Sequence, residues 1–256
     1  MSSPYMLRIS SQKGGVGKTT VATNIASIIR LMGYKVLLID GDFVNPSVGF
    51  HLGLEDINVG IRAVFKRKAK LENAVAIHDP TGLHVLAGEI SNRSFEPSDA
   101  EQNYVANALR ATSYNFVIVD TSPGYTPEAL LRHYDESIII TTPEMSACTS
   151  AIRLANIYDK MHLKHSLVIN RVRNTRYEMH TREIEQMYGG EVAGVLPEDD
   201  IVPISIAEHI PAYVLNKKAK FSRAVLDTAH KYARRSEAEP EYKPKQGFWA
   251  SLFGRR

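Results

Sequence analysis

A glycine-rich loop close to the N-terminus constrains the fold of this chain more strongly than any other feature of the sequence. Residues 11–20 read SQKGGVGKTT. A short apolar run precedes them, and a segment with apolar residues at three- and four-residue spacing follows. Glycines allow successive backbone N–H groups to point at one anion, and the N-terminus of the following helix adds positive partial charge. Strand, glycine loop and helix in this order predict a phosphate-binding loop.

Two side chains of this loop have predicted tasks of their own. Lys18 can reach the β- and γ-phosphates of a nucleotide, and the hydroxyl of Thr19 can ligate Mg²⁺. Gln12 occupies the position where the strict eight-residue pattern has a glycine, so the loop is a variant of that pattern. The loop residues predicted to bind the nucleotide are Gly14, Gly15, Val16, Gly17, Lys18, Thr19 and Thr20.

The rest of the chain alternates short β-branched runs with longer stretches of mixed polarity, which is typical of repeated βα units. Runs such as residues 36–39 and 116–119 are apolar at every position and should be covered on both faces. We therefore predict an α/β fold with a single doubly wound, mostly parallel sheet and helices on both faces. Strands are expected at residues 6–10, 35–40, 83–87, 116–120, 137–141, 166–170 and 192–196, and helices at 18–32 and 127–132.

Composition places the chain among ordinary globular proteins. It has 256 residues, of which 44% are hydrophobic, and 31 basic residues nearly balance 28 acidic ones, so the charge does not by itself indicate a nucleic-acid partner. A cytoplasmic location is expected, because no apolar window is long enough to cross a bilayer and the first residues do not resemble a signal peptide. With Cys148 as the one cysteine, an internal disulfide is excluded and a metal-cluster function is disfavoured.

Two apolar runs end in acidic residues, at strand ends where open α/β sheets collect their ligands. Residues 116–119 lead into Asp120, which we expect to hold the Mg²⁺ shell. Residues 36–39 lead into Asp40 and Asp42. A carboxylate after an apolar strand can instead cap a helix, and this alternative weighs more for Asp40 than for Asp120.

Residues 13–20, KGGVGKTT, resemble the deviant Walker A motif of the MinD/ParA ATPases, a family of P-loop NTPases. The resemblance extends over roughly residues 5–232. It implies a magnesium-dependent ATP hydrolase, converting ATP to ADP and phosphate, that forms a homodimer when ATP is bound. In this family the early lysine, here Lys13, reaches the nucleotide of the partner subunit, where its charge offsets that of the phosphates.

The same resemblance implies roles for residues beyond the loop. Asp42 matches the catalytic aspartate that orients or deprotonates the attacking water, and we expect it beside the metal together with Thr19 and Asp120. Residues 38–42, LIDGD, match the first switch of the family, which continues into the loop around Asn45, and residues 121–124, TSPG, match the second switch. The spacer between Asp42 and Asn45 is shorter than in many MinD proteins. The residues matched to the adenine pocket are Asn170, Arg171, Pro197, Glu198 and Asp199.

The sequence changes in character after residue 235. Residues 1–235 are predicted to form the ATPase domain, 236–246 a polar linker, and 247–256 an amphipathic helix. Large apolar residues of that helix fall within an arc of about 140°, with basic residues on either side, which suits the surface of an anionic membrane. They are Phe248, Trp249, Leu252 and Phe253. The segment resembles the membrane-targeting sequence of MinD proteins; folding back onto the domain and docking to a partner protein are the alternatives.

These features predict a MinD-like ATPase that dimerises on ATP, binds the inner face of the cell membrane through its C-terminal helix, and leaves on hydrolysis with the help of an activator protein. Such an enzyme would position the division site, a flagellum or pilus, or a related structure. The alternative is a ParA-type DNA-segregation ATPase that uses nucleic acid as its matrix. Basic residues available for that purpose are Arg171, Arg173, Arg176, Arg182, Lys217, Lys218, Lys220 and Arg223.

Overall fold

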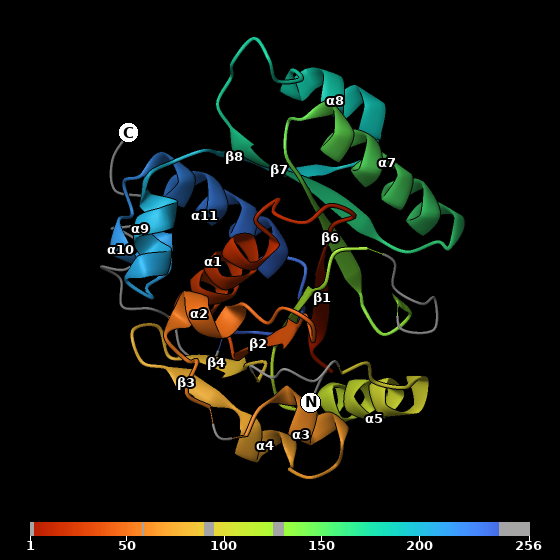
Figure 1. Cartoon of the computed structure of the whole chain (residues 1–256), viewed down its shortest axis with the longest axis vertical. Helices are drawn as coiled ribbons and strands as arrows, with labels where there is room; N and C mark the ends of the chain where they lie inside the picture. The colour runs from red at the N-terminus through yellow and green to blue at the C-terminus, as the bar shows by residue number, and fades with distance from the viewer. Residues whose placement is uncertain (1–2, 58, 90–94, 125–130, 241–256) are drawn as a thin grey trace.

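An eight-stranded sheet forms the centre of the computed structural model, which describes residues 3–57, 59–89, 95–124 and 131–240 (Figure 1). The strand order is β3-β4-β2-β5-β1-β6-β7-β8, and every neighbouring pair is parallel except β3 with β4. The predicted mostly parallel sheet is confirmed. Its strands are β1 (Tyr5–Ser10), β2 (Val36–Gly41), β3 (Ala76–His78), β4 (Leu83–Leu86), β5 (Phe116–Thr121), β6 (Glu136–Thr141), β7 (His165–Val172) and β8 (Val192–Pro197).

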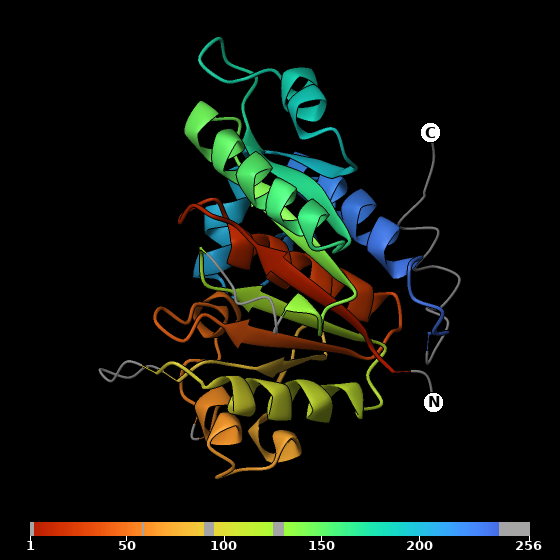
Figure 2. The ribbon, with the colours of Figure 1, turned by 90° about the vertical axis from the view of Figure 1, so that its right-hand side faces the viewer.

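Helices cover both faces of the sheet, as predicted. One face packs against α1 (Lys18–Leu31), α2 (Val48–Leu52), α9 (Ile201–Ala207), α10 (Ala212–Leu215) and α11 (Lys220–Ala233). The other face, on which α5 and α7 are prominent in Figure 2, packs against α3 (Ile61–Phe65), α4 (Leu71–Ala74), α5 (Asp99–Arg110), α7 (Met145–Lys160) and α8 (Thr181–Tyr188). In the described ranges, no helix has both the length and the apolar composition that a bilayer crossing requires.

This double covering explains the continuous apolar runs of the strands. Successive strand residues point to opposite faces, so Leu7 and Ile9 of β1 join the core beneath α1, whereas Met6 joins the core beneath α5. The ends of the seven predicted strands agree with the structure to within two residues. The sequence analysis missed β3, a three-residue edge strand. Of the helix predicted at 127–132, residues 127–130 lie outside the described residues, as do 241–246 of the linker and the predicted membrane helix.

The carboxyl ends of the parallel strands meet at one edge of the sheet, which places several predicted site residues together. The glycine loop follows β1, and Asp42 follows β2. Asp120 lies near the end of β5, where it stands opposite Asp40 of β2 in the parallel register. Asn170 lies toward the end of β7, two strands from β1. This edge is therefore where ligands of an open α/β sheet are expected to bind.

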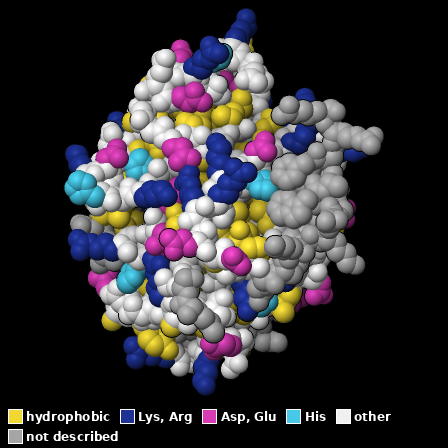
Figure 3. All heavy atoms as spheres, turned by 180° about the vertical axis from the view of Figure 1, so that it is seen from behind, with side chains coloured by type: hydrophobic (Ala, Val, Ile, Leu, Met, Phe, Trp, Pro, Cys, Tyr) yellow, Lys and Arg dark blue, Asp and Glu magenta, His cyan; other side chains and the backbone are white. Residues whose placement is uncertain are grey.

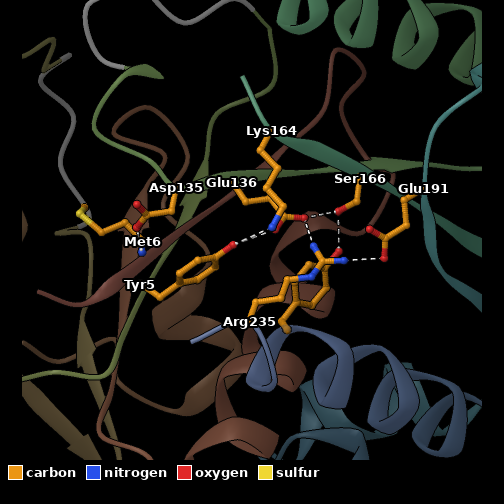
Figure 4. Close-up of polar contacts among 9 residues, drawn as sticks. Tyr5, Met6, Asp135, Glu136, Lys164, Ser166, Glu191 and Arg235 are labelled. Carbon is orange, nitrogen blue, oxygen red and sulfur yellow. Dashed lines mark hydrogen bonds and ion pairs between the residues drawn. The ribbon is translucent and has the colours of Figure 1, made fainter. Parts of the chain in front are cut away.

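At the amino ends of the parallel strands, a buried ion-pair network joins the sheet to the end of α11 (Figure 4). The fully buried side chain of Glu136 pairs with Arg235, just beyond α11, and lies 3.3 Å from the Lys164 ammonium. It also accepts hydrogen bonds from Tyr5 at 3.0 Å and from Ser166 at 2.8 Å. Burial opposes the ionisation of Glu136, but the hydrogen bonds from Arg235 and Ser166 outweigh it and hold the pKa of this carboxyl below its usual range.

Glu136→Gln should lower the free energy of unfolding by about 1.5–3 kcal/mol at pH 7, because it removes the charged acceptor of a buried network. Urea unfolding monitored by circular dichroism measures this loss. The matched control is Glu191→Gln: Glu191 pairs with the same Arg235, but its side chain is 49% exposed, so about 1 kcal/mol or less is expected. Equal losses in the two variants would contradict this account.

Because the pKa of Glu136 is lowered by folding, its stabilisation is present above the unfolded pKa of about 4.3 and is lost as the pH falls through the lower folded-state pKa.

Candidate active site

The glycine loop has the backbone geometry that the sequence predicts. Gly15 and Gly17 have φ angles of +77° and +90°, a region that glycine adopts without strain. A Cβ atom at Gly17 would also lie 2.3 Å from the amide nitrogen of Asn170, so this position has no room for a side chain. Asn170 is buried, and its Nδ2 donates a hydrogen bond of 2.8 Å to the carbonyl oxygen of Val16. Asn170 thus supports the loop from β7, and its predicted contact with adenine stays a prediction.

The start of α1 brings two of the three predicted metal-binding side chains, Thr19 and Asp120, into contact, and the predicted place of Asp42 beside the metal stays a prediction. Thr19 Oγ1 donates a hydrogen bond of 2.5 Å to Oδ2 of Asp120 in β5. The other carboxylate oxygen, Oδ1, is buried and has no hydrogen-bond partner among the described residues. Lys18, which precedes Thr19 on α1, is only 9% exposed. The site therefore holds a hydroxyl in contact with a carboxylate that has one unsatisfied oxygen, with the largely buried Lys18 within electrostatic range of that carboxylate.

The electrostatics of the two facing aspartates also favour a cation. Burial raises the pKa of Asp120 to about 7, against the hydrogen bond from Thr19 and the charge of Lys18, which lower it. Burial and then the charge of Asp120 raise the pKa of Asp40 to about 7 as well. Burial therefore disfavours the ionised carboxylates, and a bound divalent cation would stabilise them by offsetting their negative charge. Carboxylate and hydroxyl oxygens are the donors that Mg²⁺ prefers, so the residues fit this ion.

The first switch, which begins with residues 38–42 at the end of β2 and continues into the following loop, is organised by Asp40 and Asp42. Oδ2 of Asp40 accepts hydrogen bonds from the backbone N–H groups of Ser47 at 2.8 Å and Val48 at 3.0 Å, so Asp40 caps the start of α2. The capping alternative for Asp40 is therefore correct. Oδ1 of Asp42 accepts from the backbone N–H groups of Val44 and Asn45, at 3.2 Å and 3.0 Å, which folds the short spacer into a tight turn. The catalytic role of Asp42 stays a prediction.

The second switch segment lies against the glycine loop. Thr121 donates a hydrogen bond of 2.8 Å from Oγ1 to the carbonyl oxygen of Ile9, and the N–H of Gly124 donates one of 2.9 Å to the carbonyl oxygen of Ser11. Gly124 has a φ angle of +110°, which explains the glycine at this position. Residues 121–124 are thus held beside the end of β1 and the first residue of the glycine loop.

Lys13 lies at the outer side of the loop and contacts α7 of its own chain. Its Nζ is 3.0 Å from Oε2 of Glu144 and 2.9 Å from Oγ of Ser146, and both partners are at the surface. The sequence analysis did not predict these contacts, because Glu144 is 131 positions away in the chain. The structure shows one chain, so the predicted reach of Lys13 to a partner subunit stays a prediction.

A polar cavity of about 360 Å³ lies beside the loop, and some of the residues predicted to bind adenine line it. Arg171 and Glu198 line it, together with Lys13 and Arg173. Arg173 is paired with Glu198 at 3.3 Å. The remaining predicted residues have other positions: Pro197 ends β8, and Asp199 accepts backbone hydrogen bonds at the starts of α9 and α11. The adenine pocket as a whole stays a prediction.

Two residues missed by the sequence analysis connect the first switch to the loop. Ser47 Oγ lies 2.8 Å from Thr19 Oγ1. His51 of α2 contacts the Ser47 carbonyl oxygen through Nδ1 at 2.9 Å, and its Nε2 lies 3.4 Å from the hydroxyl of Thr20. The sequence carries only a weak signal for this arrangement, a serine and a histidine four residues apart after the Asp40 strand.

A glycine loop at the start of α1 and an aspartate at the end of β5, on a doubly wound sheet, define a P-loop nucleotide-binding domain. Residues 7–212 match the family described as the CobQ/CobB/MinD/ParA nucleotide binding domain. The chain belongs to this family of nucleotide-binding ATPases, and its relatives include MinD proteins.

Individual relatives agree with this assignment. The septum site-determining protein MinD of Synechocystis sp. is 30% identical over 219 residues, which cover 82% of each chain. The solved MinD of Pyrococcus horikoshii, a complex with Mg-ADP, is 25% identical and has a TM-score of 0.82, covering 90% of this chain and 96% of its own. A ParA family ATPase of Chlorobium tepidum, at 20% identity and a TM-score of 0.77 over 89% of this chain and 98% of its own, shares the fold.

Proposed function

We propose that this chain is a magnesium-dependent ATP hydrolase that dimerises on ATP, binds an anionic membrane through residues 247–256, and is released on hydrolysis. The observation that carries the catalytic part is the contact between Thr19 and Asp120 beside Lys18, with one buried carboxylate oxygen unsatisfied. Membership of the MinD/ParA family supports ATP as the nucleotide. Its service to the cell would be spatial positioning of the division site or a related structure.

The side chains would divide the reaction among them. Thr19 and Asp120 would hold Mg²⁺, which neutralises phosphate charge when it is bound with ATP. Lys18 would stabilise the charge that develops on the β- and γ-phosphates, while backbone N–H groups of Gly14 to Gly17 hold the phosphates in place. Asp42 would orient the attacking water and accept its proton, which requires the ionised carboxylate.

Membrane residence would follow from two copies of a weak anchor. Four large apolar side chains contribute a gross of roughly 6–12 kcal/mol, and ordering about ten residues into a helix removes much of it. One copy would therefore bind weakly. Two copies in one dimer bind far more tightly, because the second copy acts at a high effective concentration. Hydrolysis would separate the dimer and return each copy to weak binding.

Lys13→Ala should abolish the ATP-dependent dimer, because it removes a cation that would offset phosphate charge between two nucleotide-bearing faces. Light scattering after gel filtration, with a non-hydrolysable ATP analogue or with ADP, measures the mass. Lys66→Ala is the matched control, since Lys66 is a similarly exposed lysine that also pairs with a glutamate, Glu101 at 3.2 Å. We expect dimers with the ATP analogue for the unmodified chain and Lys66→Ala, and monomers for Lys13→Ala. A Lys13→Ala dimer at the same protein concentration would refute the role of Lys13.

The DNA-segregation alternative has less support from the described surface. Arg173, one of its candidate residues, is engaged by Glu178 at 2.9 Å as well as by Glu198. Basic and acidic side chains are intermixed over the face shown in Figure 3. ATP-dependent binding to DNA that weakens steeply with salt would nevertheless favour the alternative.

A further inference from the structure

We propose that Ser47 supplies a third protein oxygen to the magnesium ion, beside Thr19 and Asp120, and so joins the first switch to the metal. This inference rests on the proposed magnesium–nucleotide site. Its starting point is a row of oxygens: Ser47 Oγ lies 2.8 Å from Thr19 Oγ1, which in turn lies 2.5 Å from Oδ2 of Asp120. The three oxygens come from the first switch, the start of α1 and the end of β5.

The backbone of Ser47 is held by hydrogen bonds on both sides, and its hydroxyl contacts Thr19 Oγ1 from that position. Its N–H donates to Oδ2 of Asp40 at 2.8 Å, which ties it to β2. Its carbonyl oxygen accepts from Nδ1 of His51 at 2.9 Å, which ties it to α2. Binding sites work best when such supporting contacts hold the ligand side chain near its productive geometry.

The chemistry of the three groups suits one small divalent cation. Mg²⁺ takes oxygen ligands in octahedral geometry, and nucleotide sites leave several positions to phosphate oxygens and water. A serine hydroxyl is neutral, so it adds a hard oxygen without adding a further negative charge beside the facing carboxylates of Asp40 and Asp120. The buried Oδ1 of Asp120 has no hydrogen-bond partner among the described residues, so this oxygen is available to a metal ion.

A consequence follows for the segment between Asp40 and Ser47. Asp42 lies within it, and its backbone N–H donates to Oδ1 of Asp40 at 3.2 Å. With Ser47 bound to the ion, this short segment is fixed at one end by β2 and at the other by the metal. Ser47 would thereby act as a positioning residue for Asp42, so that metal occupancy sets the place of the water-activating carboxylate.

Metal replacement tests direct ligation by Ser47. In Ser47→Cys, we expect the affinity for Mg²⁺ in the presence of a non-hydrolysable ATP analogue to fall by about tenfold or more. Cd²⁺, which favours thiolate ligands, should restore binding and produce an ultraviolet thiolate-to-cadmium band. Ser47→Thr keeps the hydroxyl and should remain close to the unmodified chain. The matched control is Ser113→Cys, an exposed serine between α5 and β5; the native Cys148 is buried.

The readouts are Mn²⁺ affinity by electron paramagnetic resonance and the cadmium band, with the far-ultraviolet circular dichroism of each variant as a check that it folds. Ser47→Cys and Ser47→Ala that bind Mn²⁺ like the unmodified chain, with no cadmium band at position 47, would overturn the inference while leaving the magnesium site intact. An unmodified chain whose analogue binding ignores divalent cations would overturn the proposed magnesium-dependent function itself.

Discussion

Lys18→Ala is expected to lower the rate of ATP hydrolysis by about 10²–10³-fold, the loss typical of removing one preorganised group that stabilises transition-state charge. Lys18 is 9% exposed and lies at the start of α1, so its ammonium group acts with little screening by water. Its charge opposes the rise that burial gives to the pKa of Asp120, so the two groups lie within electrostatic range of each other. Nucleotide-dependent assembly should disappear with it, because the γ-phosphate loses its main cationic side chain.

Steady-state phosphate release in saturating Mg²⁺ and ATP measures this effect. Lys164→Ala is a suitable control, since Lys164 lies at the amino end of β7, away from the site, with a side chain 55% exposed. Phosphate release by Lys18→Ala within a few-fold of the control would mean that the loop does not bind the reacting phosphates as we propose.

Asp42→Ala is expected to slow hydrolysis by about 10²–10⁴-fold, the usual contribution of a positioned general base, while ATP binding persists. The protein should therefore accumulate as an ATP-bound dimer, visible by light scattering with ATP itself. The substitution also removes the acceptor of the N–H groups of Val44 and Asn45, so it changes the turn as well as the base.

Asp42→Asn separates the two effects, because its amide oxygen can still accept these hydrogen bonds but is too weak a base to take a proton. If Asp42 is catalytic, both variants lose hydrolysis. If Asp42→Asn hydrolyses ATP at the unmodified rate, Asp42 only shapes the turn and the catalytic assignment is wrong.

The elements that the sequence predicts correctly are those with a strong local signal. Buried parallel strands such as β5 are apolar at each position from Phe116 to Val119, and α1 combines helical spacing with a glycine loop before it and Gly33 after it. The strand β3 lacks such a signal, because Ile77 at its centre is 54% exposed and the element packs only at the sheet edge.

The same distinction applies to the site. Thr19 and Asp120 meet because both follow from motifs at the ends of neighbouring parallel strands, β1 and β5. The contacts of Ser47 and Glu144 depend instead on the paths of loops, and the spacing of apolar residues in the sequence does not predict these paths. Asn170 is a third case. The sequence predicts its position near a strand end, but its hydrogen bond to the loop backbone depends on how β7 packs beside the loop, which the sequence does not reveal.

The most direct test of the central claim is sedimentation with anionic liposomes, comparing the full chain with a chain that ends at Gln246, each in ATP and in ADP. The account predicts that the full chain sediments with the liposomes in ATP, that it stays largely in the supernatant in ADP, and that the shortened chain stays there in both nucleotides. Equal sedimentation of the two chains, or sedimentation of the full chain that ignores the nucleotide, would contradict an ATP-controlled membrane anchor.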